Sequence, residues 1–287
     1  MSAPPTATPS ELPAASSGPA LSPSRAMDFR QCPLKYRLRA IDRIPETPGR
    51  AAVRGTVVHS VLEALYGLPR GDRVPDRALT LAEPAWLRLL EDRPEVGAVV
   101  ESGGLAPFLD EVSGLVRGYY RLENPTGFDP ESCESLVEVR LEDGSPLRGY
   151  VDRIDIAPDG RLRVVDYKTG RVPAPDAEQR ALFQLKFYAL IVYRTRGVVP
   201  AQLRLIYLGA DEILTYTPDA GELERFERIV SALWTAITAA GRDGDFPPQP
   251  GWMCKFCEYQ PLCPAFGGTP PPYPGWPADT AATVPRP

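Results

Sequence analysis

The stretch GYVDRIDIAPDGRLRVVDYKTG, Gly149 to Gly170, predicts two β-strands joined by an Asp-Gly turn at 159–160. Side chains alternate between the two faces of a strand, so Asp166 and Lys168 should point the same way. The hairpin should also bring Asp152 on the first strand near Asp166 on the second. The sequence thus predicts two carboxylates and one ammonium group in a small space at the end of an apolar strand.

This group of charges has a structural and a chemical interpretation. Charged residues at a strand end often form a solvated ion pair that contributes little energy. Alternatively, a divalent cation relieves the repulsion between the two carboxylates, and their oxygen donors suit Mg²⁺ or Mn²⁺. Lys168 would then hold or deprotonate an attacking water. Arg153 and Asp155 alternate with Asp152, so we expect them to face away from it in a surface ion pair.

The rest of the chain changes character twice. Its 287 residues, 43% of them hydrophobic, are enough to bury a full core. Apolar residues recur at helical spacing over 22–130, and strand patterns dominate 131–217 apart from one amphipathic helix at 174–195. A last helix, followed by a cysteine cluster, is expected over 218–267. These patterns predict an α/β (α+β) fold with a mixed sheet flanked by helices.

Both ends of the chain differ in composition from the middle. Residues 1–21 and 268–287 are rich in proline and small residues, so we expect disordered tails around one domain at 22–267. The first segment lacks the pattern of a signal peptide and no apolar run is long enough to span a membrane, which predicts a cytoplasmic protein. The formal charge of −5 means that any nucleic-acid binding depends on local basic patches.

Four sequence motifs carry a family resemblance. GYVD followed by VVDYKTG resembles motifs II and III of the PD-(D/E)XK nuclease superfamily, in its RecB-like exonuclease branch. RGTVVHSVLE, residues 54–63, resembles the N-terminal helix motif of that branch, and QLKFYAL, residues 184–190, resembles its Q-x-x-x-Y helix. The motifs occur in the family's order and, with the cysteines, cover the chain from Cys32 to Cys263.

The resemblance implies a restriction-endonuclease-like fold and a metal-dependent deoxyribonuclease. It implies that His59, Asp152, Asp166 and the backbone carbonyl of Tyr167 bind one or two Mg²⁺ or Mn²⁺ ions, and that Lys168 positions the water for phosphodiester hydrolysis. Gln184 and Tyr188 lie four residues apart on one helix face, directed toward the active site or DNA. The family often has another acidic ligand, for which Glu138 and Glu63 are both candidates.

The cysteines extend the resemblance. Cys254, Cys257 and Cys263 form C-x2-C-x5-C, and Cys32 lies far upstream. Nucleases of the AddB and CRISPR-associated type use one early and three late cysteines to bind a [4Fe-4S] cluster. The alternative is Zn²⁺ held by four thiolates, although zinc ribbons usually contain two C-x2-C pairs and this chain has one. Cys133 is left over and is expected to be a buried thiol.

The resemblance therefore predicts a DNA exonuclease that acts on single strands or DNA ends in repair or recombination. The sequence contains no P-loop motif, so processive action would need a separate helicase partner. Two other classes of protein remain open from the residues alone. One is a nuclease-fold protein that binds DNA or a helicase without cutting, and the other is a zinc-stapled scaffold with an incidental Asp-Lys pair.

Overall fold

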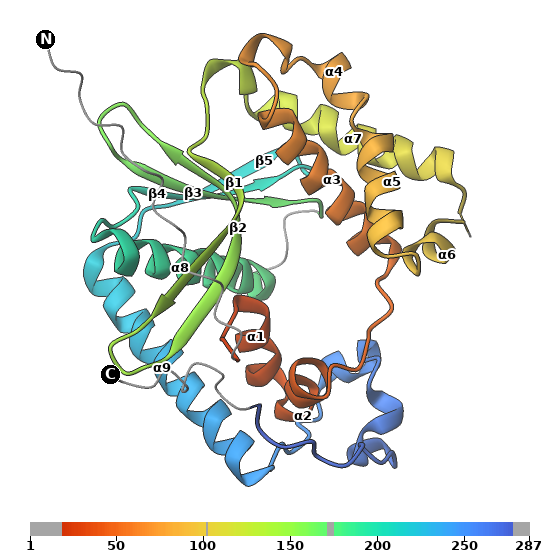
Figure 1. Ribbon diagram of the computed structural model, residues 1–287, viewed down its shortest axis with the longest axis vertical. Coiled ribbons are helices and arrows are strands. Elements are labelled where there is room, and N and C mark those ends of the chain that lie inside the picture. Colours follow the sequence, from red (N-terminus) through yellow and green to blue (C-terminus); the bar gives the residue numbers. More distant parts are fainter. Residues whose placement is uncertain (1–18, 102, 171–174, 278–287) are drawn as a thin grey trace, which may run out of the picture.

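Five strands form one mixed sheet in the computed structural model, which describes residues 19–101, 103–170 and 175–277. The strands lie in sequence order, with β3 and β4 parallel and the other neighbouring pairs antiparallel (Figure 1). Their bounds are β1 Ser132–Arg140, β2 Pro146–Ile156, β3 Leu162–Lys168, β4 Gln202–Tyr207 and β5 Glu212–Tyr216. The predicted mixed sheet with flanking helices is confirmed.

The hairpin of β2 and β3 has the register that the sequence predicts. Arg153 pairs with Val165, and the same antiparallel register places Asp152 opposite Asp166. The chain then leaves β3, forms helix α8 (Pro175–Arg196) and returns as β4 in parallel with β3. A parallel pair needs such a crossover, because a short turn cannot bring the chain back to the same end of the sheet.

Helices cover both faces of the sheet. Helices α8 and α9 (Ala220–Asp243) pack on one face, in a core that includes Val164, whereas α3 (Arg50–Tyr66) packs on the other, in a core that includes Val165 (Figure 1). The second layer also contains α4 Pro75–Leu79, α5 Ala82–Asp92, α6 Val96–Glu101, α7 Leu105–Leu122 and the 3-10 turns Arg70–Asp72 and Pro125–Gly127. β3 is apolar on both faces because it is covered on both.

Capping residues explain where two of the helices begin and end. Helix α1 (Pro23–Gln31) starts with proline at its first position, and the Ser22 hydroxyl accepts a hydrogen bond from a backbone N–H of the first turn. Asp219 caps α9 in the same way. Gly244 ends α9 in a left-handed conformation, with φ at 69°, which a residue without a side chain adopts at no steric cost.

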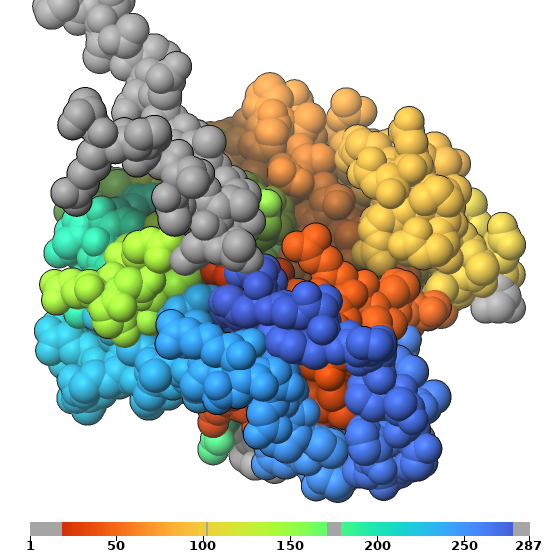
Figure 2. Space-filling model, turned by 60° about the horizontal axis from the view of Figure 1, so that its bottom comes forward, coloured from red at the N-terminus to blue at the C-terminus, as the bar shows by residue number. Residues whose placement is uncertain are grey.

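An N-terminal and a C-terminal segment of the described chain pack against each other. Leu34 of α2 (Pro33–Tyr36) and Leu38 of the following π-helical turn (Arg37–Ile41) pack against Tyr259 in a small buried cluster. Three 3-10 turns follow α9, namely Trp252–Phe256, Gln260–Leu262 and Pro264–Phe266, and Tyr259 lies between the first and the second. Figure 2 shows C-terminal residues, in blue, lying directly over N-terminal residues, in orange and red.

The folded region extends beyond the predicted limits of 22 and 267. Leu21 is completely buried and its backbone bonds to β2, with its N–H donating to Pro146 and its carbonyl accepting from Arg148. Near the other end, the Tyr273 hydroxyl donates to the carbonyl of Gly241 in α9. The first segment bonds to the part of β2 that β3 does not reach, and the second contacts α9. Residues 1–18 and 278–287 of the predicted tails lie outside the described residues.

Candidate active site

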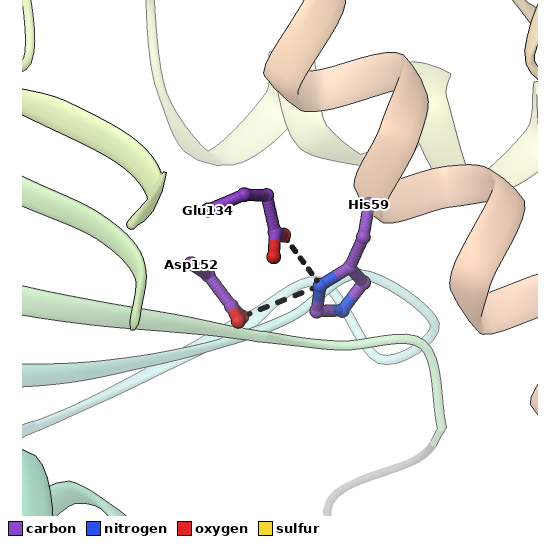
Figure 3. Close-up of side chains that lie close together, drawn as sticks. All are labelled: His59, Glu134 and Asp152. Atoms are coloured by element: carbon purple, nitrogen blue, oxygen red, sulfur yellow. Dashed lines mark hydrogen bonds and ion pairs between the residues drawn. The ribbon is translucent and has the colours of Figure 1, made fainter. Parts of the chain in front are cut away.

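His59 lies at the centre of a group of acidic and polar side chains. It extends from α3, whose neighbouring residues Val58 and Val61 are buried against the sheet. Its Nδ1 atom lies 3.2 Å from Oε1 of Glu134 and 3.6 Å from Oδ2 of Asp152. Figure 3 shows the three side chains directed toward one another from a helix and two strands.

The β3 backbone completes the contacts of His59 and Asp152. The Nε2 atom of His59 lies 3.1 Å from the carbonyl oxygen of Tyr167. The backbone N–H of Tyr167 donates a 2.6 Å hydrogen bond to Oδ2 of Asp152. The predicted ligands His59, Asp152 and the Tyr167 carbonyl therefore lie close together. Asp166 precedes Tyr167 on β3 and lies opposite Asp152 in the hairpin.

Glu134 is the acidic residue of this group that the sequence did not reveal. The two candidates named from the sequence lie outside the group of His59, Glu134 and Asp152, since Glu138 pairs with Arg148 at 2.5 Å and Glu63 lines an adjoining cavity with His59. The register of β1 and β2 places Glu134 opposite Asp152. Its φ of 43° is unusual for a residue with a side chain and costs on the order of 1 kcal/mol. Only the strand register could have pointed to Glu134.

The alternation of side chains along β2 is interrupted at Asp152, so residues before and after it face different helix layers. Before this point Gly149 faces α8, since a Cβ atom there would stand 2.4 Å from the ring of Tyr188. After it, Arg153 faces the opposite layer, where it donates to the hydroxyls of Tyr66 and Tyr167. Strict alternation therefore fails where Glu134 interrupts the pairing of β1 and β2.

The prediction of a surface ion pair between Arg153 and Asp155 is wrong. Arg153 is 0% exposed and Asp155 is buried, and they form a 3.0 Å ion pair in the core. Arg153 also forms a 2.8 Å ion pair with Glu123, which follows the last residue of α7. Burial of the pair is tolerated because Glu123 and the hydroxyls of Tyr66 and Tyr167 accept hydrogen bonds from the terminal nitrogens of the guanidinium.

Lys168 is held on the other side of Asp166. Its Nζ atom lies 2.6 Å from Oδ2 of Asp166 and donates a 2.9 Å hydrogen bond to the side-chain carbonyl of Gln184. The amide of Gln184 in turn donates to the hydroxyl of Tyr188 at 3.1 Å. The four-residue spacing of Gln184 and Tyr188 on α8 thus lets both side chains reach the same row of polar atoms.

Burial and mutual repulsion shift the protonation of the acidic group. Burial and the nearby charge of Asp166 raise the pKa of Asp152 to about 7. Burial lowers the pKa of His59, but the hydrogen bond to Glu134 and the charge of Asp152 outweigh it and raise that pKa to about 9. Without metal, a protonated imidazole therefore neutralises part of the negative charge.

The donor atoms fit a small divalent cation. The ligand atoms of His59, Glu134 and Asp152 all lie within 4.8 Å of one another. Ligands on opposite sides of a Mg²⁺ ion stand about 4 Å apart, so small side-chain movements would suffice. Carboxylate and carbonyl oxygens are hard donors of the type that Mg²⁺ and Mn²⁺ prefer.

A cavity of about 880 Å³ opens onto these residues. It is lined by Asp152, Asp166, Lys168, Gln184 and Tyr188 on one side and by the start of α1 on the other. Its volume lies within the range of ligand-binding clefts. The predicted site residues of β2, β3 and α8 therefore face one open space that a substrate can enter.

Comparison with known families identifies this arrangement. The profile of the PD-(D/E)XK nuclease superfamily matches residues 20–264. The chain belongs to the PD-(D/E)XK nuclease superfamily. The matched region runs from the first described residues through the last of the clustered cysteines, so it contains every site residue described above.

Two phage proteins and one solved structure resemble this nuclease. The Gene 69 protein of Mycobacterium phage D29 is 28% identical, over 86% of this chain and 97% of that protein. The Gene 69 protein of Mycobacterium phage L5 is 25% identical over the same shares. A candidate exonuclease from Eubacterium rectale has a similar fold, with a TM-score of 0.57 and 14% identity over 83% of this chain and 86% of that one.

The four predicted cluster cysteines of this superfamily member line one pocket. Cys32, Cys254, Cys257 and Cys263 line a cavity of about 250 Å³ between α1–α2 and the C-terminal 3-10 turns. Backbone N–H groups of Gln249 and Gly251 donate to the sulfurs of Cys32 and Cys254. Among the described residues the four sulfurs form no compact group within 4.8 Å like that of His59.

Cys133 lies away from that pocket. It is half-buried on β1, and burial raises the pKa of its thiol to about 12. A thiol with a raised pKa is a poor nucleophile and a poor metal ligand at neutral pH.

No helix in the described part of the chain is long and apolar enough to cross a membrane.

Proposed function

We propose that this chain is a Mg²⁺- or Mn²⁺-dependent deoxyribonuclease of the RecB-like exonuclease branch. It hydrolyses phosphodiester bonds of single strands or DNA ends, in repair or recombination. The observation that carries this proposal is the opposition of Asp152 and Asp166 beside Lys168, at an open cavity. A separate helicase would supply the strand for processive action, since the sequence has no P-loop motif.

His59, Glu134, Asp152, Asp166 and the Tyr167 carbonyl are the groups that would hold the metal. A bound divalent ion supplies charge stabilisation at the scissile phosphate and lowers the pKa of a bound water. Contacts within the chain restrict rotation of the two buried carboxylates, because the Tyr167 N–H donates to Asp152 and Lys168 forms an ion pair with Asp166. Such positioning before substrate binds reduces the reorganisation needed during the reaction.

Lys168 is the group proposed to act on the water and on the charge of the phosphate. Its ammonium group is anchored by Asp166 and Gln184, so it reaches the cavity in one defined position. From there it can orient the attacking water and offset negative charge that builds on the phosphate oxygens. Tyr188, through Gln184, is proposed to keep that side chain aligned.

The cysteine pocket is proposed to hold a structural [4Fe-4S] cluster. The proposal is supported by the four cysteines lining one pocket, although Cys32 lies far from the other three in the sequence. The N–H groups directed at Cys32 and Cys254 would stabilise the negative charge of thiolates. A brown colour with absorption in the blue part of the visible range would distinguish the cluster from zinc.

The test is cleavage of end-labelled DNA by protein purified without oxygen. Wild type and Lys168→Ala are incubated with single-stranded and duplex DNA in Mg²⁺ or Mn²⁺. We expect Lys168→Ala to cut at least about a hundredfold more slowly. Lys186→Ala is the matched control, because Lys186 forms an ion pair with Glu222 away from the cavity. The ladder of products from each labelled end gives the polarity.

Two results would contradict the proposal. Equal cleavage by wild type and Lys168→Ala would show that Asp166 and Lys168 are not the catalytic centre. DNA binding without cleavage by a folded, brown wild-type protein would instead favour a nuclease-fold protein that binds DNA and does not cut it.

A further inference from the structure

A second cavity adjoins the active site on the far side of His59. Its volume is about 460 Å³, and His59 and Tyr150 line both this cavity and the larger one. Four of the α3 residues that line this cavity are small, namely Ala52, Gly55, Thr56 and Ser60. The absence of long side chains at these four positions leaves a slot between the helix and the ring of Tyr150.

Tyr150 is exposed in a position where aromatic rings are usually covered. It is 58% exposed on β2, two residues before Asp152. Its neighbours Gly149 and Val151 face α8, so the ring of Tyr150 extends from the opposite face of the strand, toward the slot. Leu136 lies directly across the strand pair and is also exposed, which widens the apolar platform.

The charges around the two cavities differ in sign. The carboxylates of Glu63 and Glu134 line the slot, and they would repel a phosphate group there. The larger cavity is lined by two carboxylates, Asp152 and Asp166, but by more cations, and it would attract a phosphate. These cations are Arg25, Arg148, Lys168 and Arg180. A nucleotide is a negative phosphate joined to a neutral, flat base. The two cavities therefore match its two parts, with the phosphate at the cationic cavity and the base in the slot.

We propose that the slot takes one unpaired nucleobase of a DNA strand, stacked on Tyr150, while the adjoining phosphate lies against Asp152, Asp166 and Lys168. Strand geometry places residues two apart about 7 Å from each other, close to the separation of a base and its own phosphate. A base inside a duplex is stacked between its neighbours, so it must leave the stack before it can lie on Tyr150. The identity of the ligand as DNA rests on the proposed function, and the slot deepens it by requiring an unpaired nucleotide at the cut.

The experiment measures binding of single strands and of a hairpin-capped duplex in Ca²⁺, with 2-aminopurine as a reporter base. We expect quenching of the reporter at one position of the single strand with wild type. Tyr150→Ala should abolish that quenching and weaken single-strand binding about 5- to 100-fold, the range for loss of one base–aromatic stack. Tyr150→Phe should retain both, because it keeps the ring.

Two further variants test the slot itself. Ala52→Leu fills the slot from the α3 side, where Ala52 is exposed, and should weaken single-strand binding as Tyr150→Ala does. Ile156→Ala removes an exposed apolar side chain elsewhere on β2 and should change nothing. Thermal unfolding midpoints show that each variant is folded.

The outcomes separate the slot from the proposed function. If the wild type cuts DNA and both Tyr150→Ala and Ala52→Leu bind single strands normally, the proposal of base binding in the slot is wrong and the proposed nuclease function is supported. If the wild type does not cut but quenches 2-aminopurine through Tyr150, the slot stands and the nuclease function fails. If the wild type quenches at no position, the slot is overturned.

Discussion

The carboxylate of Asp152 accepts a 2.6 Å hydrogen bond from the backbone N–H of Tyr167. The carbonyl of Tyr167 lies 3.1 Å from His59, so a single residue of β3 holds both an aspartate of β2 and the histidine of α3. Because this anchor is a main-chain peptide group, it is as rigid as the sheet itself. Asp152 and His59 are therefore held in place before any metal ion binds, and Glu134 lies 3.2 Å from His59.

We expect Glu134 to contribute more to metal affinity than Glu138 or Glu63, the two additional acidic ligands suggested from the sequence. Glu134→Gln removes a carboxylate 3.2 Å from His59 and should weaken Mn²⁺ binding at least about tenfold. Glu138→Gln is the control, since Glu138 pairs with Arg148. Titration calorimetry measures both. Equal affinities for the two variants would contradict the assignment of Glu134.

The stability of the metal-free protein should fall between pH 6 and pH 9. Folding raises the pKa of Asp152 to about 7 and of His59 to about 9, so the folded state binds more protons than the unfolded state in this range. Raising the pH removes those protons and costs the folded state on the order of 2 kcal/mol.

Urea unfolding at several pH values, with EDTA or Mn²⁺, measures this change. Mn²⁺ should stabilise the protein more at pH 8 than at pH 6, because it competes with those protons for the same groups. His59→Asn should flatten the decline above pH 7. A metal-free protein whose free energy of unfolding stays constant over this range would contradict the raised pKa values.

Two glycines should respond in opposite directions to alanine. Gly149→Ala places a methyl group 2.4 Å from the buried ring of Tyr188, and we expect a loss of about 1–3 kcal/mol in unfolding free energy. Gly114→Ala, in an exposed turn of α7 with open space around it, should stabilise by about 0.5–1 kcal/mol. Denaturant unfolding decides the sign for each, and stabilisation by Gly149→Ala would show that Tyr188 packs elsewhere.

Arg153 should be far more important for stability than a surface arginine on the same hairpin. Arg153→Met removes the fully buried cation of the network and leaves Glu123 with Arg204 and Asp155 with Arg163, so we expect a loss of about 3 kcal/mol. Arg161→Met, in the exposed pair with Asp159, should cost at most about 1 kcal/mol. Adding Glu123→Gln to Arg153→Met should restore part of the loss. Equal effects of the two arginine variants would rule out the buried network.

The sequence alone was sufficient for the strands, the hairpin and the family. Alternation over 149–170 predicted both the strand pair and the opposition of Asp152 and Asp166, because turn type and strand period are local properties. The four-residue spacing of Gln184 and Tyr188 likewise predicted that they share a helix face. Each of these relationships depends on residues close together in the chain.

Only the tertiary structure decided which acidic residue joins His59 and where Arg153 lies. Glu134 reaches the site because β1 pairs with β2 in one register, and a shift of two residues would have placed another side chain there. Arg153 is buried because β2 changes faces at Asp152 and the layer of α3 and α7 covers it. Strand register and helix packing depend on contacts between distant segments, and local patterns do not encode them.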